Sequence, residues 1–161
     1  MYQKILVPLD GSNVGEAALP YVEGLVAELS PGTKVEVTLL QVVSSLPRYM
    51  AAGGEEMTSL PIVYTEKEIE QFKKDAAGYL NKAGEGLISK GAIVRIMVGI
   101  GRAAEEIIKV ADEINADLVA MSTHGRSGFS RWAFGSVTDR VLRGGGKPVL
   151  VVRPPRETEK T

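Results

Sequence analysis

Short apolar runs alternate along this chain with segments whose apolar residues recur every three or four positions. The runs are rich in Val, Ile and Leu and predict buried strands, whereas the three-to-four spacing is that of an amphipathic helix. Strands that alternate with helices build a parallel sheet covered on both faces. The sequence therefore predicts a single-domain α/β sandwich of three layers. Its five-stranded parallel sheet has strands expected at 2–9, 35–43, 92–98, 117–121 and 148–152.

Polar residues set the expected ends of the connecting helices, which lie at 14–29, 65–87, 104–114 and 136–142. Thr65 and Glu68 form the Thr-x-x-Glu pattern of a capping box, and Asn13 with Glu16 resembles a looser version of the same box. Pro20 lies inside the first helix, where we expect it to kink the helix or to leave the carbonyl of Glu16 without its usual partner.

The composition is that of one globular domain, because 161 residues with 44% hydrophobic content suffice for a sizeable core. We expect a domain over 1–153, with a mobile excursion at 44–63 and a polar tail at 154–161.

The net charge of −1 gives no reason to expect nucleic acid or an anionic membrane as a partner. The absence of cysteine excludes disulfides and cysteine-bound zinc. No pattern of a membrane span or a signal peptide is present, so we expect a cytoplasmic location.

A glycine-bearing loop follows the fourth predicted strand. Ser122–Gly125 is followed by nine residues and then by Gly135–Val137, where the last helix begins. The N-terminus of a helix attracts anions through its backbone N–H groups and its dipole, and glycine lets the backbone approach a phosphate closely. Ser136 with Asp139 resembles a capping box, so we expect Ser136 both to cap this helix and to contact a ligand. The segment predicts a nucleotide phosphate site beyond the carboxyl ends of the strands.

Four segments, taken in order, resemble the universal stress protein family. They are the first strand and turn (Lys4–Ser12), the start of the third helix (Gly101–Ile107), the glycine loop (Ser122–Val137) and the last strand (Gly146–Val152). The resemblance spans nearly the whole chain. It implies a Rossmann-like, nucleotide-binding fold and, in one branch of the family, ATP bound at the glycine loop, with Mg²⁺ expected on the phosphates.

The resemblance also implies which residues hold the nucleotide. Asp10 and Val42 would meet the adenosine end, and the glycine loop would line the ribose and phosphates. Ser122 departs from the motif, which has its first glycine there; serine is disfavoured if that position needs a positive φ and fits if it needs only a small residue. Arg126 and Arg131 are candidate phosphate contacts. The full expected set is Asp10, Val42, Met121, Ser122, Gly125, Gly135, Ser136 and Val137.

The function expected from these features is that of a stress-response regulator or sensor with a nucleotide-dependent state. Two other classes stay open: a slow ATP hydrolase, and a dimeric interaction module of the family branch that binds no ATP. Hydrolysis needs groups that orient water and neutralise charge, and the sequence offers neither a Walker lysine nor a convincing base. We therefore assign no catalytic residue and no metal held by protein side chains alone, and we expect a structural role for His124.

The fifth predicted strand is short and almost wholly apolar. We expect it at the edge of the sheet, where an apolar strand offers its unpaired backbone groups to another chain. The same strand of a second copy of this chain can cover the edge, if the two strands pair antiparallel about a two-fold axis. The sequence thus predicts a homodimer, which the resemblance also implies, built on Val149, Leu150, Val151 and Val152.

Overall fold

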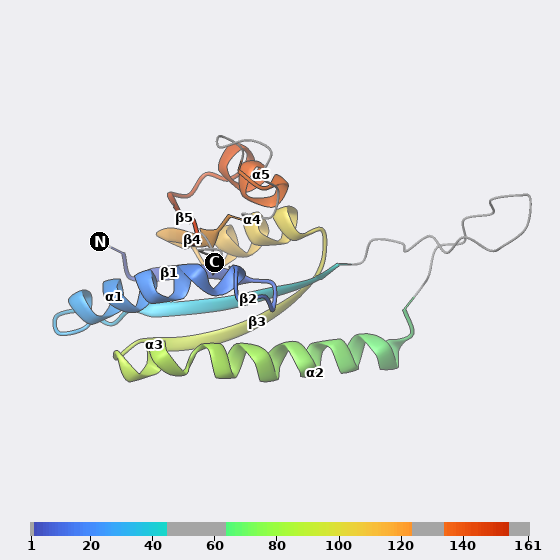
Figure 1. The fold of residues 1–161 in the computed structure, drawn as a ribbon, viewed down its shortest axis with the longest axis horizontal. Coiled ribbons are helices and arrows are strands. Elements are labelled where there is room, and N and C mark those ends of the chain that lie inside the picture. The colour runs from blue at the N-terminus through green and yellow to red at the C-terminus, as the bar shows by residue number, and fades with distance from the viewer. Residues whose placement is uncertain (1, 45–63, 124–133, 155–161) are drawn as a thin grey trace, which may run out of the picture.

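A parallel sheet of five strands, in the order β3-β2-β1-β4-β5, forms the middle layer of the protein (Figure 1). The computed structural model describes residues 2–44, 64–123 and 134–154. The predicted α/β fold is confirmed, and β5 lies at an edge of the sheet as expected. The strands are β1 (Lys4–Leu9), β2 (Glu36–Ser44), β3 (Ile93–Gly101), β4 (Leu118–Ser122) and β5 (Val149–Val152).

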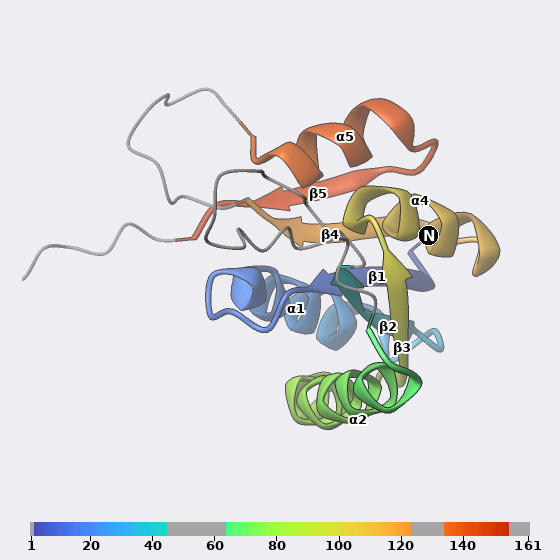
Figure 2. The ribbon, with the colours of Figure 1, turned by 90° about the vertical axis from the view of Figure 1, so that its right-hand side faces the viewer.

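Helices cover both faces of this sheet. The helices are η1 (a 3-10 helix, Gly15–Ala18), α1 (Leu19–Leu29), α2 (Glu66–Ala83), α3 (Glu85–Ser89), α4 (Ala103–Glu113) and α5 (Ser136–Gly144). Helices α1, α2 and α3 pack on one face, and α4 and α5 pack on the other. Figure 2 shows α2 at the β3 side of the molecule and α5 beside β5 at the opposite side. Among the described residues, no helix is both long and apolar enough to cross a bilayer.

β1 contributes side chains to both cores because it is a central strand, paired with β2 and β4, and helices cover both faces of the sheet there. Ile5, Val7 and Leu9 point into the core under α1, α2 and α3, whereas Leu6 points into the core under α4 and α5. None of these side chains is more than 4% exposed. Alternate residues of a strand face opposite sides of a sheet, so a central strand covered on both faces reads as a continuous apolar run.

The first helical segment differs from its prediction, because Pro20 divides it into η1 and α1. Proline has no N–H to donate, and the carbonyl of Glu16 instead accepts from the N–H of Leu19. The carbonyl is therefore not left without a partner. The capping box expected from Asn13 and Glu16 is also wrong, since Val14 is the N-cap residue of η1 and provides no side-chain cap.

The second predicted helix ends early, at Gly84, and a separate short helix follows it. The backbone of Gly84 lies against the sheet: a Cβ there would be 3.0 Å from Cγ1 of Val94 and 3.3 Å from Cδ1 of Leu39. The start of α2, in contrast, matches the prediction. The N–H of Glu68 donates to Oγ1 of Thr65 at 3.3 Å, and the N–H of Thr65 donates to Oε2 of Glu68 at 2.8 Å, which completes the predicted capping box.

Replacing Thr65 by alanine removes one half of this box. We expect Thr65→Ala to lower the free energy of unfolding by about 1 kcal/mol, because the N–H of Glu68 loses its acceptor, Oγ1 of Thr65. Urea unfolding followed by circular dichroism measures the change. Lys67→Ala is the matched control, since Lys67 is exposed in the same helical turn. Equal stability of Thr65→Ala and wild type would contradict the assignment.

Candidate functional site

A cavity of about 160 Å³ opens at the carboxyl ends of β1, β2 and β4, beside the first turns of α4 and α5. The strand order reverses between β1 and β4, and an open parallel sheet leaves a crevice at such a point. Most of its lining is apolar, and its polar side chains come from Asp10, Ser122, Ser136 and Thr138. The lining residues are Pro8, Leu9, Asp10, Gly15, Leu40, Val42, Ala103, Ile107, Met121, Ser122, Gly135, Ser136, Val137 and Thr138.

The structure brings together every expected nucleotide contact that it describes. These residues come from the ends of three strands and from the start of α5, which are far apart in the sequence. They are Asp10, Val42, Met121, Ser122, Gly135, Ser136 and Val137. Gly125, Arg126, Arg131 and His124 lie outside the described residues.

The residues that α4 contributes to the cavity were not predicted from the sequence. Ala103 and Ile107 stand one helical turn apart on the side of α4 that borders the cavity. Ile107 is also a core residue, only 3% exposed, and it lies on the apolar face of the helix predicted at 104–114. A side chain that serves both core and cavity gives no separate signal in the sequence. Only the strand order reveals this wall, because α4 packs over β2 and β3 next to the strand ends.

The turn after β1 holds Asp10 against the start of η1. Gly11 has a φ of 82°, a left-handed conformation that favours glycine, so the chain turns sharply there. The N–H and the hydroxyl of Ser12 both donate to Oδ1 of Asp10, at 2.9 and 2.6 Å. The N–H of Gly15 donates to Oγ of Ser12 at 3.0 Å. Asp10 is therefore fixed by local hydrogen bonds at the cavity wall.

Ser122 is the last residue of β4, and its backbone needs no glycine. Among the described residues, Asn115 alone combines a side chain with a positive φ. Serine at 122 thus carries no backbone strain, which decides between the two alternatives that the sequence left open. Its hydroxyl donates to the carbonyl of Gly15 and accepts from the N–H of Ala18, each at 3.0 Å.

The N-terminus of α5 reaches the cavity without a side-chain cap. Gly135 is the N-cap residue, with φ −57° and ψ 156°, and Ser136 is the first helical residue. The expected capping box is wrong, because the carboxylate of Asp139 instead accepts from Nε of Arg143 at 2.9 and 3.0 Å. The N–H groups of residues 136–138 precede the first intrahelical hydrogen bond. They lie at the cavity and can donate to an anion.

Among the described residues that line the cavity, positive charge comes from this backbone. No Lys, Arg or His is among the described residues that line it. Arg140 and Arg102 both lie near Oε1 of Glu105, at 3.0 and 4.0 Å, so Glu105 neutralises part of their charge. Within the described ranges, no group of three or more acidic or histidine side chains is placed to hold a metal ion.

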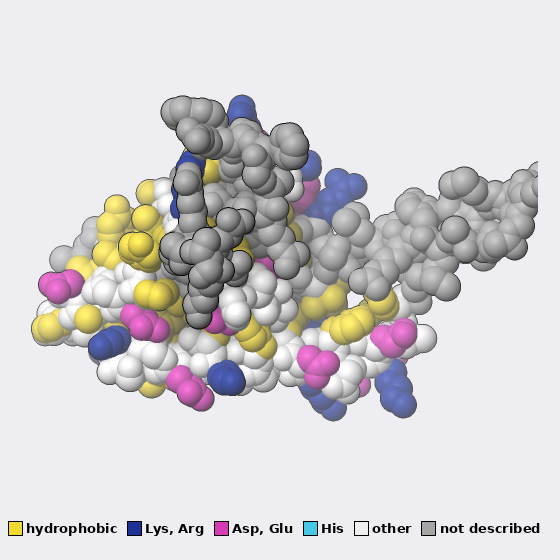
Figure 3. Space-filling model, viewed as in Figure 1, with side chains coloured by type: hydrophobic (Ala, Val, Ile, Leu, Met, Phe, Trp, Pro, Cys, Tyr) yellow, Lys and Arg dark blue, Asp and Glu magenta, His cyan; other side chains and the backbone are white. Residues whose placement is uncertain are grey.

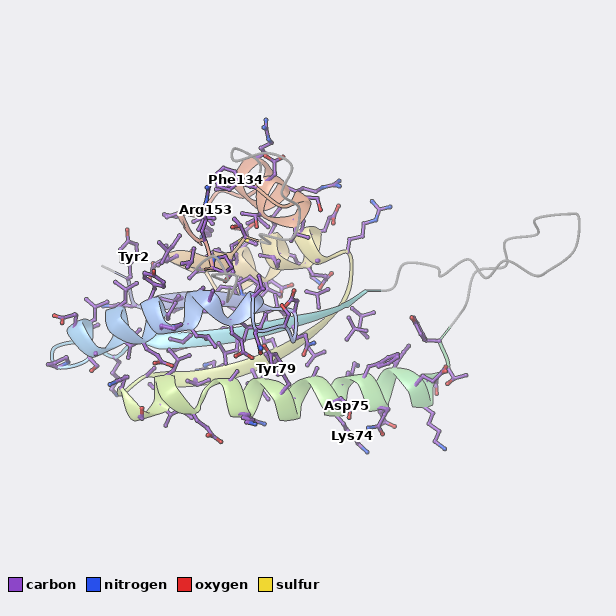
Figure 4. The ribbon with its side chains drawn as sticks, in the orientation of Figure 1. Tyr2, Lys74, Asp75, Tyr79, Phe134 and Arg153 are labelled. Carbon is purple, nitrogen blue, oxygen red and sulfur yellow. The ribbon has the colours of Figure 1, made fainter. Side chains whose placement is uncertain are left out.

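On the other face of the sheet, the hydroxyl of Tyr79 is buried close to the turn that carries Asp10 (Figure 4). It lies near the Glu16 carboxylate and the Gly11 N–H but makes no well-formed hydrogen bond within the described part of the chain. The Oε1 atom of Gln41 is likewise buried without a partner there. Burial, and then the Glu16 carboxylate, raise the pKa of Tyr79 above its usual value.

A crevice at this position in an open parallel sheet is characteristic of α/β proteins with Rossmann-like architecture. The family model described as "Universal stress protein family" matches residues 1–153, so the chain belongs to the universal stress protein family. Universal stress protein MJ0577 of Methanocaldococcus jannaschii is 30% identical over 164 residues, which span 95% of this chain and 96% of that protein. Universal stress protein YxiE of Bacillus subtilis is 28% identical over 95% of this chain and 100% of that protein.

Solved structures share the fold. The structure of MJ0577 has a TM-score of 0.71 and 27% identity over 98% of this chain and 99% of its own. A universal stress protein in complex with cAMP has a TM-score of 0.63 and 19% identity, over 96% of this chain and 98% of its own. The universal stress protein from Archaeoglobus fulgidus in complex with dAMP has a TM-score of 0.56 and 21% identity, over 93% of this chain and 97% of its own.

The raised pKa of Tyr79 gives a testable dependence of stability on pH. The unfolded chain loses this proton near pH 10, whereas the folded chain keeps it to higher pH. Its contribution to the free energy of unfolding is therefore fully present below about pH 10 and is lost as the pH rises further. Tyr79→Phe removes the titration, so the stability of wild type relative to this variant should be constant from about pH 7 to 9 and fall by about pH 11.

Urea unfolding at each pH measures this difference. Tyr21→Phe is the matched control, because it removes a tyrosine hydroxyl from a side chain that is 59% exposed. A difference between wild type and Tyr79→Phe that stays constant up to about pH 11 would show that the hydroxyl titrates normally.

Proposed function

We propose that this protein binds ATP, with Mg²⁺ on the phosphates, in the cavity at the carboxyl ends of β1, β2 and β4. The observation that carries the proposal is the N-terminus of α5. Its first three N–H groups, at 136–138, lack acceptors within the helix and lie at the cavity. Together with the helix dipole they form an anion site of the kind that phosphates occupy.

The remainder of the cavity suits a nucleoside. Val42, Met121 and Ile107 offer apolar surface from two strands and from α4, against which a flat base can pack. Asp10, at the end of β1, supplies carboxylate oxygens that can accept hydrogen bonds from ribose hydroxyls or base N–H groups. Adenine nucleotides are named in the complexes of two proteins that share the fold, with cAMP and with dAMP, and this supports an adenine nucleotide here.

The donor set of the cavity suits magnesium only as a companion of the phosphates. Mg²⁺ prefers oxygen ligands and is often held by phosphate oxygens, water and one or two carboxylates. The described lining residues include one carboxylate, Asp10, and its Oδ1 already accepts two hydrogen bonds from Ser12. When bound, the ion would neutralise phosphate charge, and the chain's own contribution would be the N–H groups at 136–138.

Binding without efficient hydrolysis is favoured over an ATPase. Phosphoryl transfer needs a group that orients water and cations that neutralise the developing charge. None of the described lining residues is a lysine, arginine or histidine. The protein then acts as a cytoplasmic regulator or sensor in a stress response, whose state depends on the nucleotide.

We further propose a homodimer that pairs β5 of two copies. β5 is an edge strand, and Val149, Leu150 and Val151 are only partly buried, so its apolar edge is open to another chain. Figure 3 shows hydrophobic side chains gathered where Figure 1 places β5 and α1. Tyr2 and Tyr21 are exposed by 44% and 59%. An antiparallel pair about a two-fold axis would cover this edge.

Gly135→Val tests the phosphate site. Valine adopts the extended backbone of Gly135 without strain, so the fold should persist, while its side chain occupies the space expected for phosphate. We expect calorimetry to give a micromolar Kd for ATP with wild type and an affinity lower by about a hundredfold or more with Gly135→Val. Gly32→Val is the matched control, because nothing lies within 4 Å of a Cβ there. Unchanged affinity in Gly135→Val would refute the site.

Val151→Lys tests the dimer. A lysine in the middle of β5 places two ammonium groups close together in an antiparallel pair and should dissociate it. Light scattering at tens of micromolar should give twice the 17.2 kDa chain mass for wild type and the chain mass for Val151→Lys. Ile93→Lys, on the opposite edge strand, is the control and should remain dimeric. A wild type of monomer mass would end the dimer proposal, and a dimeric Val151→Lys would place the interface elsewhere.

A further inference from the structure

The hydroxyl of Ser122 connects two chain segments that border the cavity. It donates to the carbonyl of Gly15 and accepts from the N–H of Ala18, at 3.0 Å in each case. A carbonyl and an N–H three residues apart are the two groups that a turn of 3-10 helix brings together. The end of β4 is thus bonded to both defining groups of one turn of η1. This support matters because η1 has four residues and its N-cap residue gives no side-chain cap.

η1 in turn fixes the position of Asp10. Gly15 lies so close to the Asp10 carboxylate that a Cβ on Gly15 would overlap Oδ1 of Asp10. The same carboxylate accepts two hydrogen bonds from Ser12, whose Oγ accepts from the N–H of Gly15. A continuous series of contacts therefore runs from Ser122 at the end of β4, through Gly15 and Ser12, to Asp10 at the end of β1.

We propose that Ser122 is a positioning residue that holds the Asp10 carboxylate at the cavity wall through η1, and that it does not bind the nucleotide directly. A serine hydroxyl has one proton to donate, and that proton goes to the carbonyl of Gly15. The hydroxyl therefore has no donor left for a phosphate oxygen. The effect of Ser122 on ATP affinity depends on the proposed function, whereas its effect on η1 exists without any nucleotide.

The bond between Ser122 and η1 also explains why serine is accommodated where the family motif has glycine. The backbone at 122 is that of an ordinary strand residue, so glycine has no conformational advantage there. A glycine would remove the hydroxyl that joins β4 to η1. Serine thus adds hydrogen bonds between β4 and η1, at a position where the backbone tolerates any small residue.

The first test measures η1 in the absence of nucleotide, by residue-resolved amide hydrogen exchange. In Ser122→Ala we expect the amides of Gly15 and Ala18 to exchange about tenfold faster than in wild type, because the turn loses both bonds to β4. Ser122→Thr keeps a hydroxyl, and its β-branched side chain suits a strand, so exchange should return toward that of wild type. Unchanged exchange at both amides in Ser122→Ala would overturn the proposal.

Ser30→Ala is the matched control for this test. The hydroxyl of Ser30 also donates to a carbonyl distant in sequence, that of Lys90, at 3.1 Å. It lies after the last turn of α1, away from the cavity. We expect Ser30→Ala to leave the exchange of Gly15 and Ala18 unchanged. Faster exchange at these amides in Ser30→Ala would show a general loss of stability rather than a local effect of Ser122.

The second test asks whether Ser122 acts on ATP binding through Asp10, by a double-mutant cycle measured with calorimetry. Ser122→Ala should weaken ATP binding by about tenfold in wild type but by no more than about twofold in Asp10→Ala, where there is no carboxylate to position. Equal losses in both backgrounds would indicate a direct contact and overturn the proposal.

Ser122→Gly restores the motif glycine. It shows whether the serine side chain stabilises the cavity wall or blocks the cavity. We expect it to weaken ATP binding by about tenfold at most, whereas a gain of several hundredfold would show that serine blocks the cavity. If wild type binds no ATP at all, the proposed function fails. The exchange measurement without nucleotide then still decides whether Ser122 holds η1.

Discussion

Parallel pairing of β1 with β2 on one side and β4 on the other determines where this protein has a site. Because the three strands run in the same direction, their carboxyl ends bring Asp10, Val42 and Ser122 to one edge of the sheet. The segment after β1 turns to the face of α1, whereas the helix after β4, α5, packs on the opposite face. Neither segment fills the space between the strand ends, so a cavity remains.

Backbone N–H groups are hydrogen-bond donors that this cavity offers to an anion. Residues 136–138 supply N–H donors, and Gly135 begins the helix without a side-chain cap. Such donors bind phosphate through fixed geometry and need no lysine or arginine. The described lining contains one carboxylate, that of Asp10, and no lysine, arginine or histidine. The proposal of a nucleotide-binding regulator rather than a hydrolase rests on this lining.

The sequence predicted the strands, their direction and half of the described lining residues, because apolar runs and glycine spacing are local signals and the family resemblance added the strand ends. It did not predict the wall formed by Ala103 and Ile107, since the same apolar face of α4 serves core and cavity. The two failed caps, at Asn13 and at Ser136, share a cause. In each case a polar side chain near the helix start has another partner: Ser12 accepts from the N–H of Gly15 at the start of η1, and Asp139 pairs with Arg143 and leaves the N–H groups of α5 without a cap. Competition between nearby polar groups is decided by three-dimensional geometry, which sequence spacing does not encode.

The most direct test of this account is a titration of the protein with ATP and Mg²⁺, followed through its assigned backbone amide NMR signals. The chain of 17.2 kDa, and a dimer of twice that mass, are both small enough for this measurement. The account predicts that the amides of residues 136–138 at the start of α5 shift most, together with amides at the ends of β1 and β4, while those of α2 remain unchanged. Shifts centred on α2 or on the β3 edge, with none at 136–138, would contradict it.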